Sequence, residues 1–358
     1  MSATRAVDAA EKLTILQVAY PFAAPAPGAV GGAEQVLLAL DNALAGAGWR
    51  SVVVAPQGAE TRGPTLEVPT PRDRIDALAR SAAQRAFAAA IEMALERWRV
   101  DIVHMHGVDF WCYLPASRRH PILATLHLPI ATYPPAVLQQ RRSELYFCCV
   151  SHTQRRDLPT ASDAIFTVPN GIDMRAFRPQ QNKQAYVLCL GRICPEKGFH
   201  LAIDAAARAG LPIILAGQVF GYAEHERYFR TEIQPRLGPR AQFIGPVGPK
   251  CRRRLLARAR AVVVPSLIDE TSCLVAMEAL ASGTPVVGFA RGALPEIVDH
   301  GRTGWLLHDV ADLPHALLQA GRLEASACRR FAERHLDMRR MIRGYLRVYR
   351  ELALGGQA

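Results

Sequence analysis

The sequence predicts an α/β protein built from two doubly wound domains. Its length of 358 residues is about twice that of a common domain. Short apolar runs alternate with amphipathic stretches, and runs such as residues 52–54, all valine, have no polar face. This combination is typical of parallel sheets covered by helices on both faces. A polar segment, residues 178–183, interrupts the pattern before it restarts, so we expect one domain over residues 1–178 and a second over residues 179–335.

The elements of the first half follow from their apolar patterns. Residues 15–19 predict a short buried strand, and a turn-rich stretch leads from there to a helix that starts near Ala33. The further expected elements are a strand at 51–55, a long amphipathic stretch at 72–99, and strands at 101–104, 122–124, 145–150 and 164–168.

The second half repeats the alternation without repeating the residues. Its expected strands are 186–190, 212–216, 242–244, 261–264 and 285–289, and its expected helices start at 199, run over a basic segment at 250–260, and lie near 273–281. The final stretch, residues 323–352, places apolar residues at helical intervals between arginines. It is either a surface helix that packs on the domains or a basic amphipathic helix that contacts a membrane.

The composition of the chain limits the classes of partner that it is expected to bind. The chain has 43 Lys and Arg against 32 Asp and Glu, a net charge of +11, which favours anionic partners such as nucleotide phosphates or anionic lipid. Basic residues are spread along the chain, so we expect no specific nucleic acid. No apolar window is long enough to span a membrane, the first twelve residues resemble no secretory signal, and the eight cysteines form no CxxC pair. We expect a cytoplasmic protein.

The segment 265–288 is the most informative part of the chain. A strand ends at Pro265, Thr271 or Ser272 is expected to cap a helix that runs to residue 281 or 282, and Gly283 follows it. The first helical turn leaves free amides, which with the helix dipole make an anion site at the carboxyl edge of a parallel sheet. These amides belong to Cys273, Leu274 and Val275.

Four charged residues surround this helix start. Glu270 precedes it, and Glu278 lies on a helix face that otherwise reads apolar, where a carboxylate needs a partner such as a sugar or ribose hydroxyl. Arg192 and Lys197 lie in a glycine-bounded loop, residues 191–198, whose cations could neutralise a diphosphate leaving group. The alternatives are a salt-bridged surface glutamate and a solvated turn.

These segments resemble the family-4 retaining glycosyltransferases, which have the GT-B architecture of two Rossmann-like domains facing each other across a cleft. The resemblance rests on GRICPEKGFHLAIDA, AGQV, FIGPVG, AVVVPS, ETSCLVAMEALASGTPVV and GALPEIVDHGRTGWLL in the second half, and on GGAEQVLLAL, DIVHMHG, ATLH, VSHT and VPNGIDMRAFRP in the first. Two glutamates eight residues apart, as Glu270 and Glu278 are, form the signature of that family.

The resemblance implies a role for each matching residue. Arg192 and Lys197 bind the donor diphosphate and stabilise the leaving charge, Glu270 holds hydroxyls of the transferred sugar, and Glu278 holds the ribose. His127 lies near the reacting sugar. The remaining donor contacts are the amides of Cys273, Leu274 and Val275, the base pocket of Phe243, Ile244 and Val247, and the loop that Gly31 and Gly32 open.

The expected reaction is transfer of a hexosyl group from a UDP- or GDP-sugar to a hydroxyl of a glycan, lipid-linked or small-molecule acceptor, with retention, in bacterial glycan, glycolipid or polysaccharide biosynthesis. The last helix, about 336–358, is expected to pack back on the first domain, as in relatives. Many relatives have Phe-Gly at positions 272–273, where this chain has Ser-Cys, which bears on the sugar accepted.

Several alternatives remain at this stage. A nucleotide-sugar epimerase of the same architecture would use the same donor site, and a non-catalytic protein could bind the same ligand. His104 and His106 point the same way from one strand, as metal-binding pairs do, but no further ligands can be placed beside them. We therefore expect no metal site and no cofactor.

Overall fold

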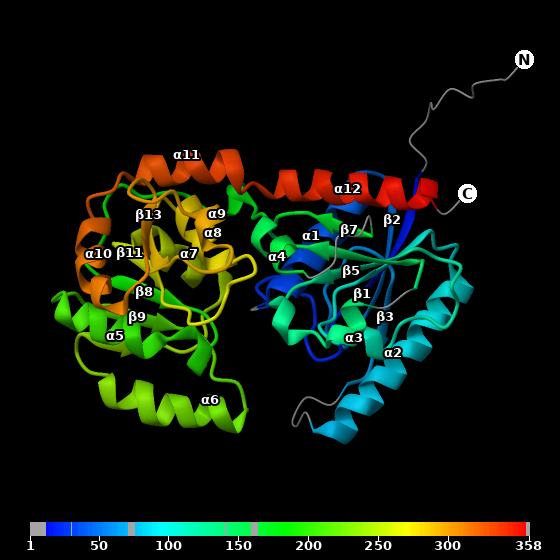
Figure 1. Cartoon of the computed structure of the whole chain (residues 1–358), viewed down its shortest axis with the longest axis horizontal. Coiled ribbons are helices and arrows are strands. Elements are labelled where there is room, and N and C mark those ends of the chain that lie inside the picture. The colour runs from blue at the N-terminus through cyan, green and yellow to red at the C-terminus, as the bar shows by residue number, and fades with distance from the viewer. Residues whose placement is uncertain (1–11, 30, 71–75, 140–141, 159–163, 356–358) are drawn as a thin grey trace, which may run out of the picture. The chain divides into compact units, whose positions relative to one another are not determined.

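The computed structural model describes residues 12–29, 31–70, 76–139, 142–158 and 164–355 (Figure 1). The beginning of the expected amphipathic stretch, residues 72–75, and the end of the expected last helix, residues 356–358, lie outside them. The chain forms two compact units, one of residues 1–124, 141–146 and 348–358 and one of residues 125–140 and 147–347, and the division falls within two strands of the first sheet.

The first sheet has seven strands in the order β3-β2-β1-β4-β5-β6-β7. The long helix α2 (Ala77–Arg97) begins at Asp76, whose side chain accepts from the amide of Ala79. The strands are β1 Thr14–Val18, β2 Arg50–Pro56, β3 Thr65–Val68, β4 Ile102–Met105, β5 Ile122–Leu126, β6 Leu145–Cys149 and β7 Ile165–Thr167, and the helices around them are α1 Gly32–Gly46, α2, α3 Pro135–Leu138 and α4 His152–Asp157.

The second sheet has six strands in the order β10-β9-β8-β11-β12-β13, which is the order of the first sheet without its last strand. Its strands are β8 Val187–Leu190, β9 Ile213–Ala216, β10 Ala241–Phe243, β11 Ala261–Val264, β12 Val286–Phe289 and β13 Gly304–Leu307. Its helices are α5 Phe199–Arg208, α6 Ala223–Tyr228, α7 Pro249–Arg258, α8 Leu274–Ala281, α9 Leu294–Ile297, α10 Leu313–Ala320 and α11 Ala325–His335.

Both faces of the second sheet are buried. Val262 and Val264 of β11 belong to one core cluster, with Met277 and Leu280 of α8. Val263, between them, belongs to a second cluster with residues of α5 and α10. Because successive side chains of a strand point to opposite faces, the two clusters are the two sides of one sheet. The prediction of two parallel-sheet, Rossmann-like domains is therefore confirmed.

Two strands and one helix boundary were missed from the sequence. The edge strand β3 is polar and partly exposed, and β13 has only four residues after a glycine. The final stretch is two helices, α11 and α12 (Met338–Gly355), and α12 begins within two residues of the start expected for the last helix. The helices separate because Ile172 pairs with the intervening residues, donating to Leu336 O and accepting from Met338 N, both at 2.9 Å.

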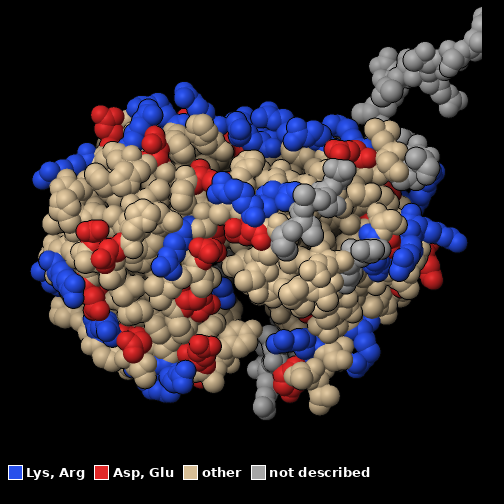
Figure 2. Space-filling view, viewed as in Figure 1, with Lys and Arg blue, Asp and Glu red and all other residues tan. Residues whose placement is uncertain are grey.

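Helix α12 is strongly two-sided. Its buried side contributes Tyr349, whose hydroxyl lies 2.6 Å from His104 Nδ1, and Tyr345, whose hydroxyl lies 3.2 Å from Thr125 Oγ1. Its outer side carries the exposed arginines 339, 340, 343, 347 and 350, and Figure 2 shows Lys and Arg side chains gathered over α11 and α12. None of the helices formed by the described residues has the length and apolar composition needed to cross a membrane.

Candidate functional site

The candidate site forms where the loops after β8 and β11 meet. These two strands are neighbours in the sheet, and chain connections leave them in opposite directions, which is the point where ligands bind in doubly wound folds. Gly198 lets the loops touch, because a Cβ at this position would overlap the carbonyl oxygen of Pro265. The amide of Leu267 also donates to Glu196 O at 2.8 Å, which joins the loops directly.

Lys197 and Glu270 form an ion pair at this junction. Lys197 Nζ lies 2.6 Å from Glu270 Oε1, and the side chains keep 20% and 11% of their exposure. The same carboxylate oxygen accepts from Ser266 Oγ. Lys197 and Glu270 were expected at one site with separate ligand contacts, and Ser266 was not expected there. In the structure Glu270 orients the ammonium group.

Arg192 lies at the start of the same loop. Its Nη2 is 3.9 Å from Glu196 Oε1, and its side chain is 41% exposed, so this contact is a weak, solvated one. Lys197 closes the short 3₁₀ turn Pro195–Lys197 and Gly198 ends it at φ +62°. The loop therefore places two cations on one short turn, one fixed by Glu270 and one able to move.

The start of α8 differs from the expectation. The capping residue is Cys273, in the left-handed region at φ +40°, and not Thr271 or Ser272. The hydroxyls of these two residues are engaged elsewhere: Thr271 Oγ1 donates to His127 O at 3.1 Å, and Ser272 Oγ accepts from Asn170 Nδ2 at 2.8 Å. Without a side-chain cap, the amides at the helix start have no oxygen from residue 271 or 272 to satisfy them.

The amides at this helix start are available to a ligand. Within the described part of the chain, Cys273, Leu274 and Val275 donate no backbone hydrogen bond outside the helix, whereas Cys273 O accepts from Ala276 N at 3.0 Å. At the other end, Gly283 at φ +68° donates to Leu280 O and Thr284 to Ala279 O, which closes the helix as expected.

Glu278 lies on α8 with only 5% of its side chain exposed, and its partner is Arg252 of α7, at 2.5 Å between Nη2 and Oε2. Burial raises the pKa of the Glu278 carboxyl, and the Arg252 charge counteracts part of that rise. Arg252 was missed from the sequence. Helical spacing in the sequence could have identified it. Arg252 lies three and four residues before the buried Leu255 and Leu256, and therefore on the same face of the helix.

The residues expected at the base pocket lie at the end of β10. The Phe243 ring packs on Phe229, with 4.8 Å between centroids. Ile244 is 41% exposed, and Val247 is half-buried against the core. An exposed isoleucine beside a packed aromatic ring is an apolar surface on which a planar base can lie.

A pocket of about 390 Å³ lies beside Glu270 in the second compact unit. Its wall combines Glu270 and Thr271 with apolar residues of the segment 129–138, including Tyr133, and with Thr153 and Asp157 of α4. His127, the residue directly after β5, is partly buried, and burial lowers the pKa of its imidazole to about 3. The side chain is therefore neutral at physiological pH.

Gly31 and Gly32 belong to the first compact unit. Gly31 is the capping position of α1, and a Cβ there would overlap the carboxylate of Glu34. Glu34 is buried and burial raises the pKa of its carboxyl. Gly31 thus accommodates a buried acid at the start of α1.

Two family models match the chain, one in each half. The model described as Glycosyltransferase Family 4 matches residues 30–176, and the one described as Glycosyl transferases group 1 matches residues 184–321. The expected domain boundary at residue 178 falls in the gap between these two matches.

Curated relatives match part of the chain. D-inositol 3-phosphate glycosyltransferases of Mycolicibacterium paratuberculosis and Mycobacterium avium are 35% and 34% identical, each over 48% of this chain and 43% and 45% of their own lengths. The chain thus spans less than half the length of these relatives.

Solved structures match almost the whole chain in fold. They include AviGT4, a glycosyltransferase involved in avilamycin A biosynthesis (24% identity, TM-score 0.70, 96% of this chain and 98% of that one) and Anabaena HepE, solved with UDP and glucose (18%, 0.73, 95% and 100%). With six strands in the same order in both sheets and the family matches in both halves, the chain belongs to the family 4 and group 1 glycosyltransferases of GT-B architecture.

Proposed function

We propose that the chain transfers a hexosyl group from a nucleotide diphosphate sugar to an acceptor hydroxyl, retaining the anomeric configuration. The observation that carries the proposal is the Lys197–Glu270 ion pair beside the open amides of α8, at the junction of the loops after β8 and β11. Cations and free backbone donors together suit a diphosphate. The family membership and the UDP complex of HepE support the donor class.

Lys197 can hold Glu270 and a phosphate at once. An ammonium group has three donors, of which the ion pair uses one. Because Glu270 fixes Nζ, the two remaining donors are oriented before the donor binds, which reduces the entropy lost on binding. Arg192, half-exposed and weakly paired, can turn to the same diphosphate.

The carboxylates of Glu270 and Glu278 are proposed to bind hydroxyls of the donor. Both contacts of Glu270 use Oε1, so Oε2 is left for a hydroxyl of the transferred sugar on the pocket wall. Glu278 uses Oε2 for Arg252, and Oε1 is the atom proposed for the ribose. Phe243, Ile244 and Val247 provide the apolar surface proposed for the base.

His127 is proposed as a neutral hydrogen-bonding group beside the reacting sugar. With a pKa of about 3, the imidazole is neutral at neutral pH and is a weak base. Its proposed contribution is therefore to orient a hydroxyl. The mixed apolar and carboxylate lining of the pocket next to Glu270 suits an acceptor that presents a hydroxyl on a partly apolar body.

In the proposed step, the bond between the anomeric carbon and the phosphate oxygen breaks, and the electron pair leaves with the nucleoside diphosphate. The acceptor oxygen bonds to the anomeric carbon on the face that the phosphate leaves, and its proton passes to the departing phosphate oxygen. Lys197, Arg192 and the amides of α8 stabilise the charge that develops on the leaving phosphate. Because these groups supply the positive charge, we propose a transfer step that needs no divalent metal.

The first experiment is a thermal-shift panel of UDP-, GDP- and ADP-sugars with the free nucleotides, in EDTA and then with Mg²⁺ added. We expect one nucleotide class to raise Tm without metal. Incubation of that donor with and without glycan or lipid acceptors, read by NMR of the anomeric proton, then distinguishes retaining transfer from epimerisation, which gives product without acceptor. No shift with any nucleotide would contradict the proposal.

Substitution of the cations tests the leaving-group role. Lys197→Ala and Arg192→Ala should each lose about 2–4 kcal/mol of transition-state stabilisation, roughly 30- to 1,000-fold in kcat. Arg254→Ala, which removes an exposed arginine of α7, is the matched control and should keep wild-type turnover. Near-wild-type rates in both loop variants would show that the leaving charge is stabilised elsewhere.

A further inference from the structure

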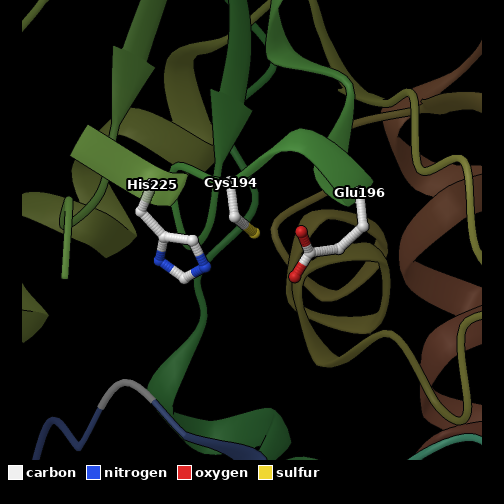
Figure 3. A group of neighbouring side chains, drawn as sticks. All are labelled: Cys194, Glu196 and His225. Carbon is white, nitrogen blue, oxygen red and sulfur yellow. The ribbon is translucent and has the colours of Figure 1, made fainter. Parts of the chain in front are cut away.

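Three potential metal ligands of different kinds meet behind the cationic loop. Cys194 precedes the 3₁₀ turn that contains Glu196, and His225 lies in α6, which contacts that turn. One ligand atom from each residue lies within 4.8 Å of the others. Figure 3 shows the Glu196 carboxylate and an imidazole nitrogen of His225 turned toward the Cys194 sulfur.

Two of the three side chains lie where water is scarce. Cys194 is fully buried, and His225 keeps 8% of its exposure. Nδ1 of His225 is buried and has no hydrogen-bond partner among the described residues, and the ring nitrogen on the Cys194 side in Figure 3 is the other one, Nε2. The Cys194 sulfur makes a long contact of 3.6 Å to Arg192 O, and the Cys194 thiol also hydrogen-bonds to Glu196. A metal that bonds to sulfur and imidazole would replace these thiol contacts.

Charge at the cluster suits a cation. The Glu196 carboxylate is the anionic ligand of the group. A divalent cation would bind Cys194 as the thiolate and displace the thiol proton.

We propose that Cys194, Glu196 and His225 form a site for a divalent cation of the zinc class. The set of one sulfur, one nitrogen and one oxygen suits Zn²⁺ or Co²⁺ and disfavours Mg²⁺ and Ca²⁺, which take oxygen ligands. Three protein ligands leave a fourth position of a tetrahedral metal to water. The expectation of no metal site missed this group because His225 is distant in sequence and reaches the loop only through the fold.

The site acts on the loop and takes no part in the proposed transfer step. Cys194 and Glu196 belong to the segment that carries Arg192 and Lys197, whereas His225 belongs to a separate helix. A metal that joins them ties the cationic loop to α6 and restricts its motion. The proposal therefore stands or falls independently of the donor chemistry, since its readouts are metal binding and stability.

The test is a titration of the full chain with Co²⁺ after removal of metals with a chelator. We expect one equivalent to bind with the near-ultraviolet charge-transfer absorption of a cobalt–thiolate bond, and Zn²⁺ to displace it. Cys194→Ser should abolish the absorption, and Glu196→Gln should weaken Co²⁺ binding by more than about tenfold. The matched control, Cys112→Ser, removes an exposed cysteine and should leave the titration unchanged.

A second measurement does not depend on the spectrum. Zn²⁺ should raise the Tm of the wild-type chain and of the Cys112→Ser variant, and should leave the Tm of the Cys194→Ser variant unchanged. Circular dichroism of each variant before metal addition checks that it is folded. Absence of the thiolate absorption in folded wild-type protein, or its persistence in Cys194→Ser, would overturn the proposal.

Discussion

The two sheets have the same strand order but use their polar residues differently. β1 and β4 of the first sheet occupy the positions that β8 and β11 occupy in the second. On β4, the buried His104 meets the hydroxyl of Tyr349 at 2.6 Å, a neutral contact within the core. After β8 and β11, Lys197 meets Glu270 at 2.6 Å at a pocket wall, with donors and acceptors left over.

This difference shows that topology supplies a place for chemistry and local residues decide whether it is used. In the first sheet, His104 of β4 and Tyr349 of α12 satisfy each other inside the core, which favours stability. In the second, glycine at position 198 and the uncapped start of α8 keep the backbone open to a ligand. The following predictions test the comparison, from the largest expected effect to the smallest.

Removal of Arg252 should have the largest effect on stability. Arg252→Met leaves the Glu278 carboxylate buried without its cation, and we expect a loss of about 3 kcal/mol in the free energy of unfolding. Urea unfolding of the full chain measures it. The double variant Arg252→Met/Glu278→Gln removes the charge as well and should recover part of the loss. A single variant as stable as wild type would show that the pair is not structural.

Burial of His127 makes stability depend on pH in the acid range. Because folding lowers the pKa of this imidazole from 6.5 to about 3, the unfolded chain binds the proton more readily between these values. Stability from this group is present above pH 6.5 and is lost as the pH falls. His127→Asn should reduce the difference in unfolding free energy between pH 7.5 and 4.5 by about 2 kcal/mol.

The control for this prediction is His308→Asn, at an exposed histidine of the second half. It should leave the acid dependence as in wild type, because the side chain is in contact with solvent in the folded chain as it is in the unfolded chain. Equal acid dependence in wild type and His127→Asn would mean that the His127 side chain is solvated.

The hydrogen bond of the first sheet should matter for stability alone. Tyr349→Phe removes the hydroxyl that meets His104, and we expect a loss of about 1 kcal/mol in unfolding free energy with transfer rates unchanged. Tyr222→Phe, at a residue 45% exposed, is the control and should change neither quantity. A loss of turnover in Tyr349→Phe at unchanged stability would contradict the assignment of a purely stabilising role to this contact of the first sheet.

The sequence predicted the fold well because its signals are local. Continuous apolar strands, helix spacing and the glycine after α8 all appear within a few residues of each other. The site was predicted only as a set of neighbouring loops. The partners of its charged residues could not be assigned, because Arg252, Ser266 and His225 come from other elements and their orientation depends on packing across the sheet.

The capping position of α8 shows the same limit at one residue. Hydroxyl residues at 271 and 272 predicted a side-chain cap, but longer-range contacts to His127 and Asn170 hold both hydroxyls, and Cys273 takes the capping position. Local capping preference gave way to tertiary hydrogen bonds, which no pattern of spacing in the sequence reveals.

The smallest expected effect is at Cys273, and it separates backbone strain from side-chain packing. At φ +40° a side chain with a Cβ is strained by about 1 kcal/mol, whereas glycine is not. Cys273→Ala removes the buried sulfur and keeps the strain, and Cys273→Gly removes both. Because glycine also gains entropy when unfolded, we expect Cys273→Gly to be more stable than Cys273→Ala by about 0.5 kcal/mol, measured by thermal unfolding. A more stable alanine variant would mean that the helix start adopts another backbone conformation, and with it the proposed amide site for the diphosphate would be lost.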